Sequence, residues 1–273
     1  MKKSISARVS CLLILIFLWG CNKEDEVIFP GSGSINAENQ ASETLKSAYT
    51  IINFSGYDWY VKDGTGLGPG PNNWSANNVW VDELGKLHLK ISYNEVTQKW
   101  ECADIYTTQN LGFGKYEWWI DSRLDQMDKN VVLGLFNYPT GLNSPDGSNE
   151  IDIEFSRWGV ENANVGNYVV YPARLLSGYS KWSNSFPVSL SGSYTTQRFT
   201  WSSSAVNFQS LHGWQSDNTN LFYSKSFTPS RKKAKTYIPQ QALPIHINLW
   251  LFRGMAPSNN QPVEVIIGKF TKS

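Results

Sequence analysis

Hydrophobic and polar residues alternate along much of this chain in short runs, and a period of two is typical of β-strands with one buried face. Residues 79–81 and 87–91 alternate in this way. They flank the turn sequence 82–85, so together they predict a β-hairpin. Residues 263–267 predict a further strand near the C-terminus. Long helical periodicity and internal repeats of about 20–50 residues are absent. The pattern predicts an all-β fold.

One predicted strand, residues 150–155, carries an acid at every second position. Its apolar residues should face a core, and Glu150, Asp152 and Glu154 should share the opposite face. Three like charges on one strand face repel each other and lose hydration when covered, so they cost stability unless a site uses them. Retaining glycoside hydrolysis uses such a set, because it needs an ionised and a protonated carboxyl group about 5 Å apart. On an ideal strand the Cα atoms of Glu150 and Glu154 lie about 13 Å apart, so the side chains would have to converge. A solvated strand face or a calcium site is the alternative.

Segment 150–155 resembles the active-site signature of glycoside hydrolase family 16, in the uninterrupted form with one residue between Asp152 and Glu154. Other segments are similar to family motifs and follow in the same order: 74–79 (W-x-A-N-N-V), 85–89 (G-K-L-x-L), 112–117 (G-[YF]-G-x-Y-E) and 248–250 (N-L-W). The resemblance covers about residues 54–270. It implies a jelly-roll β-sandwich of two curved antiparallel sheets.

The resemblance also implies the activity, a retaining endo-β-glycanase acting on an internal bond of a polysaccharide. Glu150 would be the nucleophile and Glu154 the acid/base, with Asp152 between them modulating the charge of both. A β-1,3-glucan or a mixed β-1,3/1,4-glucan is the expected substrate. Three alternatives stay open: a transglycosylase, a β-galactanase, and a glycan-binding surface protein without turnover.

Five further residues match positions where the family contacts its substrate: Phe136, Tyr138, Asn167, Asn248 and Trp250. Phe136 and Tyr138 share one face of the predicted strand 131–138, and Asn248 and Trp250 share one face of another. Core packing is the alternative for Phe136 and for Trp250. At the cleft rim, where the family has a Phe and an Asn, this chain has Gly70 and Gly66, which leaves the glucan linkage open. The Gly- and Pro-rich segment 64–71 around them is expected to be a loop.

The N-terminal sequence predicts that the protein is exported and attached to a membrane. Lys2, Lys3 and Arg8 precede an apolar run, 11–19, that is short for a membrane-spanning helix and suits a signal peptide. Residues 18–21 resemble a bacterial lipobox, which implies cleavage before Cys21 and its lipidation; an ordinary secretory signal is the alternative. We therefore expect a lipoprotein signal peptide at 1–20.

After Cys21 the chain is polar. Residues 22–26 are similar to the acidic export signal that sends Bacteroidetes lipoproteins to the outer face of the outer membrane. Residues 27–46 lack a hydrophobic period and predict a flexible tether. The expected division is the lipidated Cys21 and tether at 21–48, followed by a family 16 catalytic domain at 49–273.

Composition agrees with one enzyme domain. A chain of 273 residues that is 41% hydrophobic can bury one large core. With 24 Lys+Arg against 23 Asp+Glu, the net charge of +1 offers no overall field for nucleic acid or a strongly sulfated polymer, so a neutral polysaccharide is favoured.

The basic run 231–235 is short and lacks interleaved aromatics, as is typical of a solvated loop. Twelve Trp and 13 Tyr suit sugar binding, although at least half of them should be core. We expect a monomer.

Cysteine and histidine predict no further chemistry. With Cys11 removed and Cys21 lipidated, only Cys102 remains, so no intrachain disulfide forms and Cys102 is expected to be a buried hydrophobe. His88, His212 and His246 lack metal-ligand spacing and receive no role. The sequence thus predicts no catalytic metal and no cofactor, while a structural calcium ion stays open.

Overall fold

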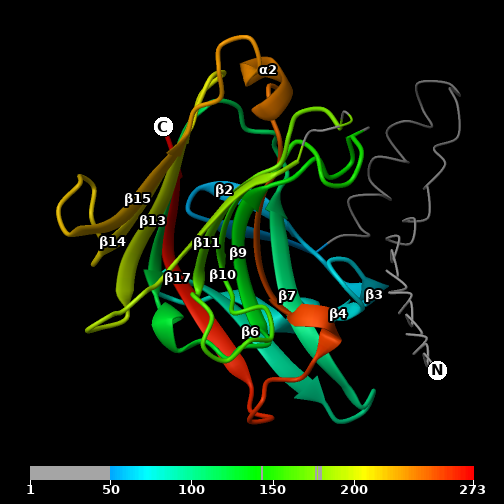
Figure 1. The fold of residues 1–273 in the computed structure, drawn as a ribbon. Coiled ribbons are helices and arrows are strands. Elements are labelled where there is room, and N and C mark those ends of the chain that lie inside the picture. The colour runs from blue at the N-terminus through cyan, green and yellow to red at the C-terminus, as the bar shows by residue number, and fades with distance from the viewer. Residues whose placement is uncertain (1–49, 143, 176, 178–179) are drawn as a thin grey trace, which may run out of the picture.

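A computed structural model of the protein describes residues 50–142, 144–175, 177 and 180–273 (Figure 1). The predicted signal peptide, Cys21 and the tether lie outside the described residues. Within the described part, no helix combines the length and the apolar character needed to cross a membrane.

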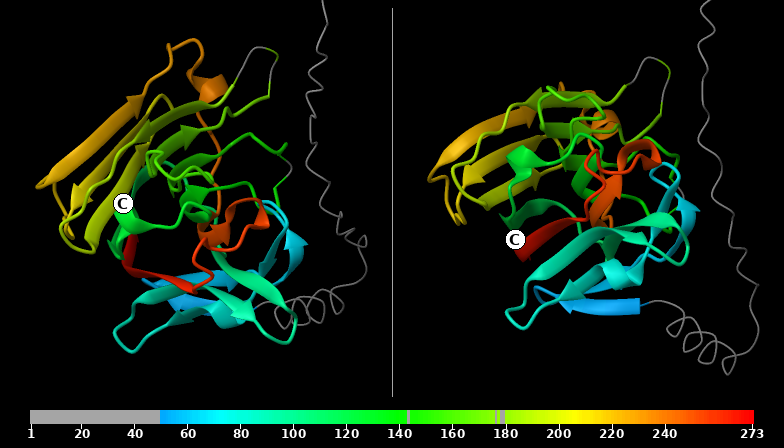
Figure 2. Two further views of the ribbon diagram at one scale, coloured as in Figure 1. Left: turned by 60° about the horizontal axis from the view of Figure 1, so that its bottom comes forward. Right: turned by 90° about the horizontal axis from the view of Figure 1, so that it is seen from below.

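Two antiparallel sheets pack face to face (Figures 1 and 2). The first sheet has the order β1 (Thr50–Phe54), β2 (Tyr57–Val61), β7 (Lys99–Thr107), β16 (Ile245–Leu251), β9 (Val131–Asn137), β10 (Ile151–Phe155), β11 (Gly166–Val170) and β12 (Trp182–Phe186). The second has the order β5 (Val79–Val81), β6 (Leu87–Asn94), β17 (Val263–Lys272), β8 (Gly114–Asp121), β13 (Tyr194–Trp201), β14 (Val206–His212) and β15 (Leu221–Phe227). This is the predicted all-β jelly roll.

Short elements complete the fold. The end of β6 pairs with β7 and so joins the two sheets. A small hairpin, β3 (Gly64–Leu67) and β4 (Asn72–Trp74), lies beside β7, with β4 parallel to it. Helical structure in the described part consists of α2 (Ala234–Tyr237) and the 3₁₀ turns η1 (Ala76–Asn78), η2 (Leu124–Gln126) and η3 (Phe252–Gly254).

The core lies between the sheets because alternate residues of most strands are large and apolar. In β6, Leu87, Leu89 and Ile91 are fully buried, whereas the residues between them are not. Aromatic rings dominate the core of the second sheet, where Trp118 packs against Phe199 with centroids 5.6 Å apart and against others at similar spacing. Aromatic side chains bury large areas, and tilted ring pairs add a further favourable term. Cys102 is buried and free, as predicted.

Two strand regions predicted from the sequence are present, and one predicted loop contains a strand. The hairpin at 79–91 is confirmed, and Gly85 supplies the positive φ of +75° that its turn requires. The strand predicted at 131–138 is β9, one residue shorter. The loop predicted at 64–71 is wrong in its first half, where Gly64–Leu67 forms β3. This short strand is held by backbone pairing to β4 and has no apolar alternation, so the sequence carries no period that would reveal it.

Candidate active site

The three predicted carboxyl groups lie together in the first sheet, with Asp152 and Glu154 on β10 and Glu150 directly before it. Ile151, Ile153 and Phe155 are fully buried in the core. Because side chains alternate along a strand, Glu150, Asp152 and Glu154 extend from the opposite face. Asp152 is only 3% exposed, and the two glutamates are half-buried. The acids are therefore partly covered by protein although they face away from the core.

Local hydrogen bonds fix the backbone around Glu150, the first of the three acids. Asn149 adopts a left-handed backbone conformation with φ of +56°, which Asn tolerates better than most residues, and its Nδ2 donates to Ala173 O at 3.2 Å. Next along the chain, Ile151 N donates to Asn137 Oδ1 at 2.8 Å, and Glu150 O accepts from Tyr171 N at 2.9 Å. The backbone on both sides of Glu150 is thus held by neighbouring strands and loops.

The strand register shows which side chains accompany the acids. Residues paired across antiparallel strands lie on the same face, so two rows cross the sheet. One row contains Asp152, Phe136, His246, Tyr106 and Tyr60. The other contains Asn167, Glu154, Gly134, Asn248 and Asp104. We call this surface the acidic face.

Several polar side chains of the acidic face are covered by protein. Asn248, Asp104 and His246 are 2%, 2% and 5% exposed, although all three lie on the side of the sheet away from the core. Neighbouring side chains and loops therefore enclose much of the two rows.

Gly134 leaves space on the acidic face for the side chains of Asn248 and Phe136. A Cβ at this position would collide with Asn248 Oδ1 and lie 3.2 Å from a ring carbon of Phe136. Asn248 Oδ1 is itself buried and has no hydrogen-bond partner among the described residues. A buried acceptor without a donor costs free energy, so it favours a ligand hydroxyl that donates to it. This placement fits the predicted substrate-binding role of Asn248.

Four rings of the first row contact one another in sequence across the sheet. His246 stacks on Phe136 at 4.9 Å and on Tyr106 at 5.0 Å, and Tyr106 continues to Tyr60 at 5.3 Å. His246 also lies 3.3 Å from Asp104 Oδ1 through Nδ1 and 2.8 Å from Thr140 Oγ1 through Nε2. His246 was assigned no role from the sequence, so its position between two aromatic rings beside the acids was not predicted.

Tyr106 and Asp104 were also missed by the sequence analysis. Asp104 and Tyr106 flank the apolar Ile105, and a period of two would have placed both residues on one face. Nothing in the sequence showed that this face is shared with the acids, because the pairing passes through β16 and β9.

Trp250 lies at the border of the acidic face. It pairs with Val132 of β9 and shares the face of Asn248, but it is only 8% exposed. Trp158 packs against it with the two indole rings 6.4 Å apart, and Phe252 packs in turn on Trp158 at 5.6 Å. Trp158 has a φ of +53°, which is uncommon for a bulky residue. Trp250 is thus a packing residue at the border of the acidic face, and its sugar contact stays a prediction.

Tyr138 and Asn167 border the acids on two sides. Tyr138 donates its hydroxyl hydrogen to Asp146 Oδ1 at 2.7 Å and meets His246 edge-on. Asn167 lies opposite Glu154, and its Nδ2 donates to Ser156 O and Val165 O, both at 3.1 Å. The amide hydrogens of Asn167 thus hold both ends of the loop between β10 and β11. Both residues lie where the resemblance placed them, and their sugar contacts stay a prediction.

Burial dominates the electrostatics of the three acids. It raises the pKa of Asp152 well above its usual range, and the charges of Glu150 and Glu154 raise it further. Burial also raises the pKa of Glu150 to about 8, against the opposing effect of a hydrogen bond with Asp152. It raises the pKa of Glu154 to about 7. The cluster therefore holds protons at neutral pH, as an acid catalyst must.

A cation stands next to this cluster. The positive charge of Lys181 lowers the pKa of all three carboxyl groups and so opposes burial. Lys181 Nζ donates to Tyr171 Oη at 3.2 Å and lies 5.0 Å from the centre of the Tyr171 ring. Neither residue was singled out from the sequence, because both lie beyond strand ends where no period applies.

Replacing Asp152 by Asn should stabilise the fold, and more so at high pH. A carboxyl group whose pKa is raised by folding binds its proton more tightly in the folded state, so its contribution to stability falls as pH rises from the unfolded pKa through the folded one. Asp152→Asn removes that loss. We expect Tm to rise by about 2–4 °C at pH 8, the equivalent of roughly 1 kcal/mol, and by less at pH 5. Calorimetry at both pH values measures this, and a larger gain at pH 5 would contradict the assigned shift.

The described residues contain no group of three or more His, Cys, Asp or Glu side chains arranged to hold a metal ion.

The chain is similar to known proteins in structure rather than in sequence. No family model matches the chain, and no curated protein is significantly similar to it in sequence. Several solved structures have a similar fold. The β-glucanase of Bacillus licheniformis superposes with a TM-score of 0.60 and 21% identity, covering 82% of this chain and 96% of the other. The chain has the β-glucanase fold.

Other structures agree with this assignment of the fold. A β-1,3-1,4-glucanase (lichenase) from a mouse hindgut metagenome gives a TM-score of 0.58 at 18% identity, over 82% of this chain and 98% of that one. A glycoside hydrolase family 16 endo-glucanase from Bacteroides ovatus gives 0.59 at 14% identity, over 79% and 94%. The described part of the chain thus corresponds to nearly the whole of each β-glucanase.

Proposed function

We propose that the chain is a retaining endo-β-glycanase of glycoside hydrolase family 16 that hydrolyses O-glycosidic bonds inside a polysaccharide. The observation that carries the proposal is the set of three largely covered carboxyl groups on one strand face, with raised pKa values and aromatic and amide side chains beside them. A binding protein has no use for three aligned buried acids, which cost it stability. Similarity in fold to β-glucanases supports the same function.

In the proposed reaction Glu150 attacks the anomeric carbon while Glu154 protonates the departing oxygen. A glycosyl ester of Glu150 forms, and the leaving chain departs. Glu154, now ionised, takes a proton from water, which attacks the ester from the opposite side and restores the original configuration. Each glutamate thereby returns to its starting protonation state.

The assignment of the two glutamates rests on the resemblance. The side chains of Asp152 and Glu150 share a hydrogen bond that lowers the pKa of Glu150 and raises that of Asp152, so Asp152 is the donor. A donated hydrogen bond stabilises the ionised form of Glu150, which the nucleophile needs, but burial still keeps the pKa of Glu150, at about 8, above that of Glu154, at about 7. The pKa values alone do not assign the two roles, so the choice of Glu150 as nucleophile and Glu154 as acid/base follows from the resemblance.

The substrate is proposed to be a β-1,3-glucan or a mixed β-1,3/1,4-glucan. The stacked rings from Phe136 through His246 and Tyr106 to Tyr60 cross the sheet beside the acids, and the half-buried members Phe136, Tyr106 and Tyr60 offer apolar ring edges to a sugar. The similarity in fold to a β-1,3-1,4-glucanase supports the same class of substrate.

The proposal is tested with purified protein lacking residues 1–21. Lichenan, laminarin, xyloglucan and a β-galactan are each incubated with it, new reducing ends are counted, and the anomer first released is identified by NMR. We expect internal cleavage of a β-glucan with retention. Binding without release from any of the four would support the glycan-binding alternative, and longer products with added acceptor sugars would support the transglycosylase.

We also propose that Cys21 carries a lipid anchor that displays the enzyme on the outer membrane surface. The lipobox-like sequence and the acidic residues after it support this. Cys21→Ala in the full chain should move the protein from the membrane fraction to the soluble fraction, because a chain without acyl groups loses its anchoring signals. Membrane attachment that persists in this variant would refute the anchor.

A further inference from the structure

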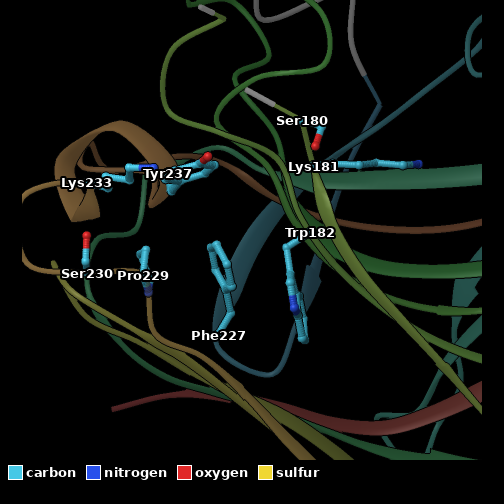
Figure 3. A pocket seen from close by; sticks show the side chains of 8 residues that line it. All are labelled: Ser180, Lys181, Trp182, Phe227, Pro229, Ser230, Lys233 and Tyr237. Atoms are coloured by element: carbon cyan, nitrogen blue, oxygen red, sulfur yellow. The ribbon is translucent and has the colours of Figure 1, made fainter. Parts of the chain in front are cut away.

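Side chains that pack on one another shape the acidic face, because a nearby hollow of about 430 Å³ lies on the other side of the first sheet (Figure 3). Trp182, which lines this hollow, pairs with Val170, and Val170 pairs with the core residue Ile151. Trp182 and Phe227 stack on each other at 5.2 Å within it, and Lys181 extends away from it. The hollow therefore adds nothing to the acidic face.

His246 is the enclosed member of the ring series on the acidic face. It is 5% exposed, whereas Phe136 and Tyr106, the rings on its two sides, are half-buried. The planes of these two rings lie at 24° and 17° to the imidazole. An apolar side chain would fill the same space without burying two polar nitrogens, which costs free energy unless both are hydrogen-bonded.

Both imidazole nitrogens have partners, and these come from different parts of the fold. Nδ1 lies 3.3 Å from Asp104 Oδ1 of β7, and Nε2 lies 2.8 Å from Thr140 Oγ1 in the loop that follows β9. Asp104 is buried, and Lys62 Nζ lies 3.7 Å from its Oδ2. An ionised carboxylate can only accept, so Nδ1 carries the hydrogen and Nε2 of the neutral ring accepts from the Thr140 hydroxyl. The imidazole thus bridges β7 and this loop.

The loop held by this bridge carries groups next to Glu150. Thr140 N donates to Tyr138 O at 2.9 Å, and the Tyr138 ring meets the imidazole at 90° with the centroids 6.0 Å apart. The Tyr138 hydroxyl in turn donates to Asp146 Oδ1 at 2.7 Å. Burial is the main cause of the raised pKa of Glu150, and the charge of Asp146 adds to it. One end of the bridge therefore leads to the surroundings of the proposed nucleophile.

Phe136 connects the other side of His246 to the acids. It pairs across the strands with Asp152, and its ring stacks on the imidazole at 4.9 Å. Because the ring is half-buried, part of its surface stays open. A ring already held by a neighbour loses less conformational freedom when a ligand binds, and this favours affinity.

We infer that His246 is a positioning residue, which holds the rings of Phe136 and Tyr138 in place for the sugar beside the cleaved bond by bridging Asp104 and Thr140. The inference rests on the proposed glycanase activity. At 5% exposure His246 is too enclosed to contact the substrate, so it acts through the two rings.

Thr140→Val tests the bridge, because it removes one hydroxyl and leaves the imidazole and the three acids unchanged. Calorimetry with the purified protein measures Kd for lichenan and for laminarin. We expect Kd of the tighter-binding polymer to rise about three- to tenfold, as loss of one hydrogen bond implies. KM should rise by the same factor with kcat nearly unchanged, since no acid is altered. Thr140→Ser keeps the hydroxyl and should restore binding.

Thr196→Val is the matched control on the second sheet, where Thr196 Oγ1 donates to Gly213 O at 2.9 Å. It should lower Tm and leave Kd unchanged, as a merely structural hydroxyl would. His246→Phe keeps a ring between Phe136 and Tyr106 but lacks both nitrogens, so it should weaken binding at least as much as Thr140→Val. Adding Thr140→Val to His246→Phe should then cause no further loss, because both remove the same bridge.

Unchanged Kd in Thr140→Val, an equal change in Thr196→Val, or independent losses in the double variant would overturn the inference. If His246→Phe does not fold, the Thr140 variants and the Thr196 control decide it. A protein that binds a glucan without forming new reducing ends would refute the proposed activity, while the Kd comparison would still decide the role of His246. Absence of binding to both polymers would overturn the inference as well.

Discussion

Glu150→Gln should lower kcat on the best β-glucan substrate by about four orders of magnitude or more, because the amide cannot form the glycosyl ester. Glu154→Gln should lower it by about 10²–10⁴-fold through loss of proton transfer. Both variants should remain folded, since each replaces a half-buried acid by a neutral side chain of the same shape. Reducing-end assays measure the loss, and calorimetry with the intact polymer should show that binding survives.

Chemical rescue separates the two glutamates. A small anion such as azide can enter the space left by Glu150→Ala and attack the anomeric carbon, which should restore turnover and give a glycosyl azide. Glu161→Gln is the matched control, because Glu161 is exposed and pairs with Lys129 away from the acidic face. Near-normal activity of Glu150→Gln, or a large loss in the control, would remove Glu150 from the role of nucleophile.

Trp250→Ala should reduce both activity and stability, because the side chain borders the acidic face and is almost fully buried. Truncating a buried Trp costs about 3–5 kcal/mol of folding free energy. Loss of the ring beside Asn248 should also lower kcat/KM of the folded protein by about 10–100-fold, equivalent to roughly 1.4–2.8 kcal/mol. Trp250→Phe keeps an aromatic surface and should recover part of both losses. Urea denaturation and initial rates below the transition measure the two effects separately.

The control for Trp250 is a tryptophan between the sheets. Trp118 is fully buried among Tyr116, Phe199 and Phe270, so Trp118→Phe should cost stability without changing kcat/KM of the folded fraction. If Trp250→Ala behaved in the same way, Trp250 would be a packing residue only.

Most of the fold could be predicted because alternation is a local property. The acids of β10 and the hairpin at 79–91 were visible for this reason, since each depends on residues adjacent in sequence. Strand β3 was missed because glycines carry no side chain to alternate, and it is held by backbone pairing with β4 and by a hydrogen bond from Trp74 Nε1 to Leu67 O.

The site was predicted only in part, because its remaining residues meet through strand register. His246 reaches the acids through pairing of β16 with β9, and Asp104 through pairing of β7 with β16. No local pattern encodes these pairings, so His246 received no role and Asp104 was not considered. Trp250 was predicted as a sugar contact on resemblance, and only the structure shows that it is almost fully buried and packs against Trp158.

The way the acidic face is assembled has a consequence for how the protein folds. Its two rows draw on β7, β9, β10 and β16, and the central pairing of β7 with β16 joins residues far apart along the chain. Contacts of such long sequence separation carry a high loop-closure cost and form slowly. No early, locally structured intermediate can contain a complete site. During refolding, recovered catalysis would therefore report completion of the whole sheet, and the enzyme's own turnover would act as a probe of the final folding step.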